Sequence, residues 1–300
     1  MNKRLLSTLI LFTIGLFIIG VSTAFLNIYR TNSSRKYIAQ PNQRILLLGD
    51  SHPACSILED PTMVHAAKSG EAWFYQVMKG KWILENNPSI HTVLIELNLG
   101  QLSPIMENWI WDNEHVERAM KSYYSILPGH YLIDLFKKDP LLFVQSNLIA
   151  QRRLLSEKPS ASNHEYFKMK EWGGFEGNEQ NCLDSLRAVK RTGGELMIQP
   201  NQDNVSALKE FVQWCQTKNI AIIFIRCPMH PSADYRSDRS ISEWRNQNFP
   251  GIPFLDFQHH IKGDEMFLDR EHLNVKGAKI FTPQFLEAIG QSIRPIQTTH

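Results

Sequence analysis

The sequence has no excess of charge of either sign and few cysteines. Its formal net charge is +2, and the basic residues form no arginine-rich or zinc-finger pattern, which argues against nucleic acid as a partner. The cysteines show no CxxC or other metal-binding spacing. They either form up to two disulfides in an oxidising compartment or remain buried thiols. The four are Cys55, Cys182, Cys215 and Cys227.

Internal repeats and low-complexity tracts are also absent, and long apolar runs are missing beyond the N-terminus. There, Lys3 and Arg4 precede a largely apolar run from Leu5 to Ile28, longer than the roughly 20 residues that cross a bilayer. We expect residues 1–29 to form a transmembrane helix that anchors the protein, or alternatively a signal cut after Ser22-Thr23-Ala24. Positive charge stays cytoplasmic, which predicts an extracytoplasmic C-terminal domain, periplasmic or at the cell surface, and secreted if the signal is cleaved.

A polar linker (30–43) leads to alternating strand and helix patterns over residues 44–292. This alternation predicts a three-layer α/β/α sandwich with a mainly parallel, flavodoxin-like sheet. Short apolar runs indicate strands in 45–48, 62–70, 91–98, 220–228 and 252–257. Periodic apolar residues indicate helices in 71–87, 204–219 and 275–290.

The stretch from about 100 to 200 does not follow this alternation. It contains helical patterns and a Gly/Asn-rich segment, "EWGGFEGNEQN". We interpret it as a helical and loop insertion over the C-terminal edge of the sheet. A separate domain is the alternative, although no flexible linker bounds it.

The stretch "RILLLGDSHPACSI" ends an apolar strand on Gly49-Asp50-Ser51. Glycine, aspartate and serine are common turn formers, so the tripeptide can be an ordinary strand end. A serine at the C-terminal tip of a parallel strand is also where open α/β sheets place reactive groups. The tripeptide alone does not decide between these interpretations.

A second polar turn, "FLDREHLNVKG", precedes the last expected helix. Asp269 and His272 are three residues apart, so the carboxylate can accept a hydrogen bond from the imidazole and leave Nε2 free to take a proton. Alternatively, Asp269 or Asn274 only caps the helix and His272 is a surface residue.

Together, these two motifs resemble the SGNH (GDSL-type) hydrolase superfamily. The resemblance covers roughly residues 44–98 and 205–290 and excludes the middle of the chain. Gly-Asp-Ser alone is a weak signal, and the Asp-x-x-His-Leu-Asn-x-x-Gly run is more specific. The resemblance implies that Ser51 is the nucleophile, His272 the base and Asp269 the residue that orients the base.

The resemblance also implies an oxyanion hole built from the Ser51 N–H, the Gly70 N–H and the Asn98 side chain. Gly70 precedes an expected helix, whose first N–H groups suit an anion. Asn98 ends the third strand, but Glu96 stands where the family has glycine and Leu99 where it has an acid. Asn98 is therefore either an oxyanion donor or an ordinary turn residue.

Two further histidines lie beside the expected site. His52 either packs against or caps the first helix, or binds substrate; His230, at the end of the fourth strand, is a second candidate for substrate binding. His259 and His260 lack a third nearby ligand in zinc spacing, and we expect neither a metal nor another cofactor.

These features predict an esterase or acyltransferase that forms an acyl-enzyme on Ser51. The resemblance and the expected location suggest acyl groups, above all O-acetyl groups, of a cell-envelope or extracellular glycan as substrate, or a small ester. The expected partners are the membrane, through the N-terminal helix, and a membrane acyltransferase. The alternatives are a catalytically silent binding or scaffold module of a polysaccharide-modification complex, and a structural α/β domain with chance motifs.

Overall fold

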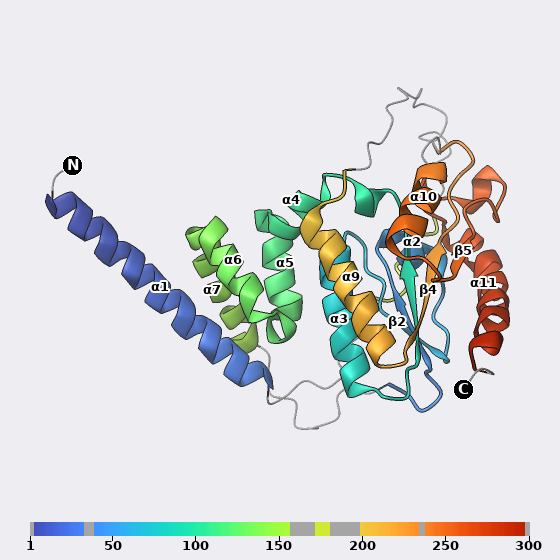
Figure 1. Cartoon of the computed structure of the whole chain (residues 1–300). Helices are drawn as coiled ribbons and strands as arrows, with labels where there is room; N and C mark the ends of the chain where they lie inside the picture. Colours follow the sequence, from blue (N-terminus) through green and yellow to red (C-terminus); the bar gives the residue numbers. More distant parts are fainter. Residues whose placement is uncertain (1–2, 33–38, 157–171, 181–198, 234–237, 298–300) are drawn as a thin grey trace. The chain divides into compact units, whose positions relative to one another are not determined.

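The structure is a computed structural model that describes residues 3–32, 39–156, 172–180, 199–233 and 238–297 (Figure 1). The described residues belong to two compact units. The first draws on residues 1–37 and 107–168, and the second on residues 38–106 and 169–300.

The first unit is helical. Its aromatic side chains join the N-terminal helix to two later helices: the rings of Phe17 and Phe136 lie 5.1 Å apart, and Phe143 packs so closely on Gly20 that a Cβ there would lie 2.3 Å from its ring. Glycine therefore permits this close crossing. The elements are α1 (Lys3–Asn32), α4 (Met106–Trp111), α5 (Asn113–Tyr123), η2 (Tyr124–Ile126), α6 (Gly129–Lys138) and α7 (Pro140–Ser156).

Within the described ranges, we find no helix with the length and apolar character needed to span a bilayer. The predicted transmembrane helix is therefore not confirmed.

The second unit contains a five-stranded sheet in the order β2-β1-β3-β4-β5, and every neighbouring pair is parallel. This is the strand order of flavodoxin-like folds, and it confirms the predicted parallel α/β architecture. The strands are β1 (Ile45–Leu48), β2 (Met63–His65), β3 (Thr92–Glu96), β4 (Ala221–Arg226) and β5 (Phe254–Asp256).

Helices lie on both faces of this sheet (Figure 1). On one face Gly80 of α3 packs closely on both Leu48 of β1 and Phe211 of α9, since a Cβ on Gly80 would come within 2.7 Å of Leu48 and 3.3 Å of Phe211. On the other face Leu47 belongs to a buried apolar cluster with Phe281 and the rest of the inner side of α11. The helices are α2 (Ser51–Ser56), α3 (Trp73–Asn86), α9 (Gln202–Thr217), α10 (Asp238–Asn248) and α11 (Val275–Gln297). Of these, α2 and α10 are not among the helices predicted from the sequence.

The strands end together at the edge that carries the two motifs. Leu48, the last residue of β1, pairs with Ile95 of β3. At the next position, a Cβ on Gly49 would lie 2.2 Å from the Pro53 ring and 3.2 Å from the Cβ of Glu96. Only glycine fits between β3 and the start of α2, so the chain can turn sharply from strand to helix.

Three of the four cysteines lie in the described residues. Cys55, Cys215 and Cys227 are buried free thiols, and Cys182 lies outside the described residues. Burial raises the pKa of the Cys55 and Cys215 thiols to about 12, so both are protonated at neutral pH.

Candidate active site

The chain brings Ser51 and His272 together from opposite ends of the second unit. Ser51 is the first residue of α2, and its Oγ lies 2.7 Å from His272 Nε2. The other imidazole nitrogen, Nδ1, is 2.9 Å from both carboxylate oxygens of Asp269. A serine, an imidazole and a carboxylate are therefore arranged in hydrogen-bonding sequence, which is the geometry of an activated nucleophile.

The turn that carries His272 is fixed by its own backbone. The Asp269 carboxylate accepts hydrogen bonds from the N–H groups of Glu271 (2.8 Å) and His272 (2.9 Å), and Phe267 pairs with Leu273 across the turn. Partial burial acts to raise the pKa of Asp269, but the hydrogen bond and charge of His272 lower it overall. Asp269 is therefore held as a carboxylate while it orients the imidazole.

Asn274 caps the helix that follows, since its Oδ1 accepts from the Gly277 N–H at 3.0 Å. The capping interpretation of this turn thus holds for Asn274, whereas Asp269 contacts both the backbone and the imidazole.

His230, in the loop that follows β4, supports the same turn. Its N–H donates to the Arg270 carbonyl at 2.9 Å, and its ring nitrogens lie 2.7 Å from Ser232 Oγ and 3.2 Å from Asp264 Oδ1. The side chain is buried and its ring packs edge-on against Phe267. These contacts indicate a role in placing the turn, while the predicted contact of His230 with substrate stays a prediction.

Gly70 lies in the turn between β2 and α3 with a φ of +69°. This loop is tied to the serine loop, because the Lys68 N–H donates to the Gly49 carbonyl at 3.0 Å. The roles of the Gly70 and Ser51 N–H groups as oxyanion donors stay predictions.

Asn98 is buried at the end of β3, but its side chain is engaged elsewhere. Its Nδ2 donates to Asp50 Oδ2 at 2.8 Å and lies 3.2 Å from His52 Nδ1, while its Oδ1 accepts from the Gln101 N–H at 3.0 Å. In this arrangement the amide holds Asp50 through one Nδ2 hydrogen, and its role as an oxyanion donor stays a prediction.

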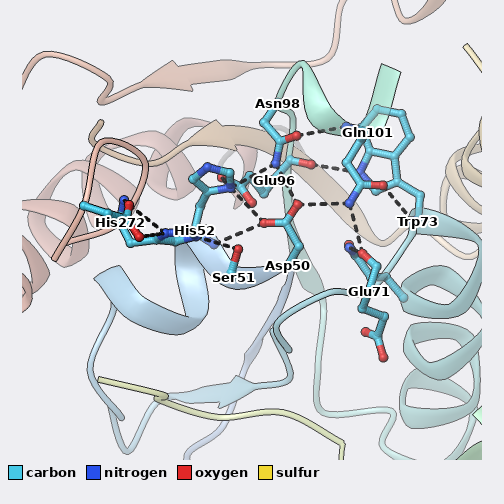
Figure 2. A network of polar contacts seen from close by, with 11 residues as sticks. Asp50, Ser51, His52, Glu71, Trp73, Glu96, Asn98, Gln101 and His272 are labelled. Carbon is cyan, nitrogen blue, oxygen red and sulfur yellow. Dashed lines mark hydrogen bonds and ion pairs between the residues drawn. The ribbon is translucent and has the colours of Figure 1, made fainter. Parts of the chain in front are cut away.

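Asp50 accepts four hydrogen bonds, which fill the acceptor capacity of an ionised carboxylate. The donors are the N–H of His52 (3.1 Å), His52 Nδ1 (2.9 Å), Asn98 Nδ2 (2.8 Å) and Gln101 Nε2 (3.0 Å) (Figure 2). Burial acts to raise the pKa of Asp50, but the His52 charge and these hydrogen bonds lower it. Asp50 is thus an anion at the base of the site.

Glu96 completes a buried charged cluster with Asp50 and His52. Its Oε1 is 3.6 Å from His52 Nδ1, and the Glu96 side chain is 2% exposed. Burial acts to lower the pKa of His52, but the two carboxylates raise it to about 10. Burial and the Asp50 charge raise the pKa of Glu96. We therefore assign an imidazolium beside the nucleophile.

This cluster was not predicted from the sequence, although His52 and Glu96 can both be seen there. Against the SGNH motifs, Glu96 is only a departure from the family pattern. A carboxylate in place of a strand-end glycine, together with a histidine next to the serine, is the signal that could have revealed a buried ion pair.

Gln101 extends the polar network away from Ser51. This residue was also not predicted as part of the site. Its Nε2 also donates to the Glu71 carbonyl at 2.9 Å, and its Oε1 accepts from the Trp73 N–H at 3.0 Å and lies 3.2 Å from Asn204 Nδ2 (Figure 2). Nothing in the local spacing around Gln101 distinguishes it from a loop residue, because its partners come from three separate segments.

Part of the predicted insertion lies along this edge. Gly174 donates to the Ala67 carbonyl at 2.9 Å and Glu176 to the Ala54 carbonyl at 2.7 Å, while the Val275 N–H donates to Asn178. The segment 172–180 thus joins the β2 loop, α2 and the start of α11.

Two groups of side chains in the described residues place three potential metal ligands within 4.8 Å of one another. One contains His52, Glu271 and His272, and the other contains Asp50, His52 and Glu96. Both depend on His52, whose raised pKa favours the protonated form that cannot bind a metal. The donor set therefore fits an ion-pair network better than a metal centre.

Comparison with known proteins adds little to this geometry. A family model that carries no description matches residues 155–294, just under half of the chain. No curated protein matches. Among solved structures, the chain is similar to a candidate acylhydrolase from Bacteroides fragilis NCTC 9343, with 9% identity, a TM-score of 0.38, and coverage of 87% of this chain and 93% of that one. A similarity at this TM-score carries no argument about fold or function.

Proposed function

We propose that the protein is a serine ester hydrolase or acyltransferase of the SGNH type, with Ser51 as nucleophile, His272 as base and Asp269 as the residue that orients the base. The observation that carries this proposal is the 2.7 Å contact between Ser51 Oγ and His272 Nε2, together with the Asp269 carboxylate on the opposite nitrogen. Each group is within the working distance of about 2.6–3.2 Å for such a relay.

In the first half-reaction His272 Nε2 takes the Ser51 proton as Oγ bonds to the acyl carbon. The carbonyl electron pair moves to oxygen, where N–H donors stabilise it. The intermediate then collapses, His272 protonates the departing oxygen, and an acyl-enzyme remains on Ser51. In the second half-reaction water or a hydroxyl group attacks the acyl-enzyme, assisted by the same imidazole.

The acceptor decides between the two activities. Water makes the protein an esterase, and a sugar hydroxyl makes it an acyltransferase. The proposed substrate is an O-acylated glycan of the cell envelope or the extracellular space, or a small ester. This proposal rests on the resemblance of the motifs and on the sequence of the N-terminus.

A fluorophosphonate probe tests the reaction class without knowledge of the native substrate, because it labels only an activated serine. We expect the full chain to gain one phosphonyl group by intact mass spectrometry and Ser51→Ala to gain none. Ser103→Ala, which removes a buried hydroxyl hydrogen-bonded to the Gly100 carbonyl, is the matched control and should label normally. Labelling of Ser51→Ala at the wild-type rate would contradict the proposal.

A catalytically silent binding or scaffold module is the second candidate. The observation that favours it is the engagement of the Asn98 amide by Asp50, which takes up one of the two hydrogens of an expected oxyanion donor. This candidate predicts an unlabelled wild-type chain that still binds an acetylated oligosaccharide, a result measurable by calorimetry.

The proposed location is outside the cytoplasm, on the evidence of the N-terminal charge pattern alone. Alkaline phosphatase fused after residue 40 should be active, and the same reporter fused after Arg4 should be inactive. An inactive fusion at residue 40 would overturn this orientation.

A further inference from the structure

The two ring nitrogens of His52 differ in their hydrogen bonding within the described residues. Its Nδ1 faces Asp50, Glu96 and Asn98, but its Nε2 is buried and has no hydrogen-bond partner among the described residues. Buried polar atoms are nearly always paired, so an unpaired imidazole nitrogen calls for an explanation. A group that arrives with the substrate would supply the missing partner.

The ring of His52 lies beside the imidazole that contacts Ser51. The His52 ring stacks on the ring of His272, with 5.2 Å between centroids and 26° between planes. Its Nδ1 lies 3.2 Å from the Nδ2 of the Asn98 amide. His52 therefore occupies the space between the base that contacts Ser51 and the amide expected to hold the oxyanion (Figure 2).

Asn98 is poorly placed for that task. One Nδ2 contact is the 2.8 Å hydrogen bond to Asp50, and the other is the 3.2 Å approach to His52. The amide is held on both sides, by Asp50 through Nδ2 and by the Gln101 N–H through Oδ1, so its orientation is set by the cluster. The protonated Nδ1 of His52 cannot accept the second Nδ2 hydrogen, whereas the Nε2–H of His52 is a charged donor without a hydrogen-bond partner in the described residues.

We propose that His52, and not Asn98, is the side-chain donor to the oxyanion that forms when Ser51 attacks the acyl group, and that Asp50 and Glu96 hold it for this role. The inference rests on the proposed function. As Oγ bonds to carbon, the Ser51 proton moves to His272 and the carbonyl electron pair moves to oxygen. The His52 Nε2–H donates a hydrogen bond to that oxygen and keeps its proton.

The buried carboxylates explain why His52 suits this task. They raise the pKa of its imidazole to about 10, so both ring nitrogens carry hydrogen at neutral pH. A charged donor fixed in a site of low dielectric stabilises a developing anion more strongly than a neutral donor in water. Glu96 is therefore a positioning residue that acts through His52.

The rate of fluorophosphonate labelling tests this inference, because phosphonylation passes through a transition state with negative charge on the phosphoryl oxygen. His52→Phe keeps a ring against His272 but removes the donor, and it should lower the maximal labelling rate about 10²–10³-fold with little change in the initial binding of the probe. His52→Gln retains a neutral N–H and should recover part of the rate. Asn98→Ala should lower the rate less than about tenfold.

His130→Phe, at an exposed histidine of α6, is the matched control and should label at the wild-type rate. Because His52→Phe leaves two buried carboxylates without their cation, the double variant His52→Phe/Glu96→Gln is measured beside it, with folding checked by near-ultraviolet circular dichroism. The same large loss is expected in the folded double variant.

Either of two results would overturn the inference: labelling of the folded His52 variants within threefold of wild type, or a loss in Asn98→Ala as large as that in His52→Phe. These results differ from failure of the proposed function, in which the wild-type chain itself is not labelled.

Discussion

At the scale of single residues, the site depends on two histidine–carboxylate pairs that lie side by side. His272 with Asp269 serves the nucleophile, and His52 with Asp50 lies against it with stacked rings. The two pairs differ in exposure: the Asp269 side chain is 43% exposed, whereas that of Asp50 is 8% exposed. The exposed pair can exchange protons with solvent, and the buried pair is suited to holding a constant charge.

Ser51, His272 and Asp269 should act as one unit in kinetics. Ser51→Ala and His272→Ala should each lower the hydrolysis of a small acetyl ester by about 10⁴-fold or more, and the double variant should lose little more than either alone. Asp269→Asn should retain more activity, because the imidazole survives with a poorer tautomer. Steady-state kinetics with thermal melts as folding controls would show this, and additive losses would contradict it.

The buried pair makes stability depend on pH in a defined direction. Because the folded state raises the pKa of His52 from 6.5 to about 10, the stability it contributes is fully present below about pH 6.5 and is lost as pH rises through about 10. Burial and the Asp50 charge raise the pKa of Glu96, so Glu96 also contributes stability that is lost as pH rises, and this loss begins at a lower pH than the loss from His52.

We therefore expect the free energy of unfolding to fall between pH 6.5 and 10 in urea titrations. The variant His52→Gln/Glu96→Gln should show a smaller fall over that interval. A wild-type stability that rises with pH across this interval would contradict the assignment of His52 as a buried cation.

At the scale of elements, the turn before α11 depends on close contact between the helix and the loop that precedes it. A Cβ on Gly277 would lie 2.2 Å from the Met266 carbonyl oxygen, whereas one on Gly290 of the same helix would meet nothing within 4 Å. The first glycine is required by packing and the second is not.

Gly277→Ala should lower the free energy of unfolding by about 1–3 kcal/mol, because a backbone carbonyl must move. It should also lower labelling of Ser51, since His272 lies in the displaced turn. Gly290→Ala, the matched control, should raise stability by about 0.5–1 kcal/mol, as expected for alanine in a helix interior. Chemical denaturation of both variants tests this, and equal effects would refute the packing argument.

At the scale of the whole molecule, a buried lysine links segments that are distant in sequence. Lys79 of α3 is fully buried, and its Nζ lies 2.5 Å from Glu71 Oε2 and 2.6 Å from the Trp172 carbonyl oxygen. Burial lowers the pKa of Lys79, and Glu71 opposes this change. Lys79 therefore joins the segment 172–180 to α3.

Lys79→Met should destabilise the protein by about 3–5 kcal/mol, because it leaves the Glu71 carboxylate buried without its partner. Lys79→Met/Glu71→Gln should recover much of that loss, since no unpaired charge remains. Lys81→Met, at an exposed lysine of the same helix, should change stability by less than about 0.5 kcal/mol. Urea denaturation compares the three, and a loss in the double variant as large as in Lys79→Met would show that charge burial is not the cause.

Local sequence patterns located most strands and helices of the second unit. Apolar runs ending at turn residues located β1, β3 and β4, and 3.6-residue periodicity located α3, α9 and α11, with ends within a few residues except at the C-terminus of α11. The short α10 was missed because its sequence, "DRSISEWRNQN", is mostly polar and has few apolar positions to show a period.

The sequence by itself determined the order of strands and helices and singled out Ser51, Asp269 and His272, because hydrophobic periodicity and short motifs are local properties. Only the tertiary structure decided which groups meet at the edge of the sheet. The partners of Asp50 come from α2, the end of β3 and the turn after it, and the unpaired nitrogen of His52 follows from that packing. A hydrogen bond between residues about fifty positions apart depends on strand order and register, which local spacing does not encode.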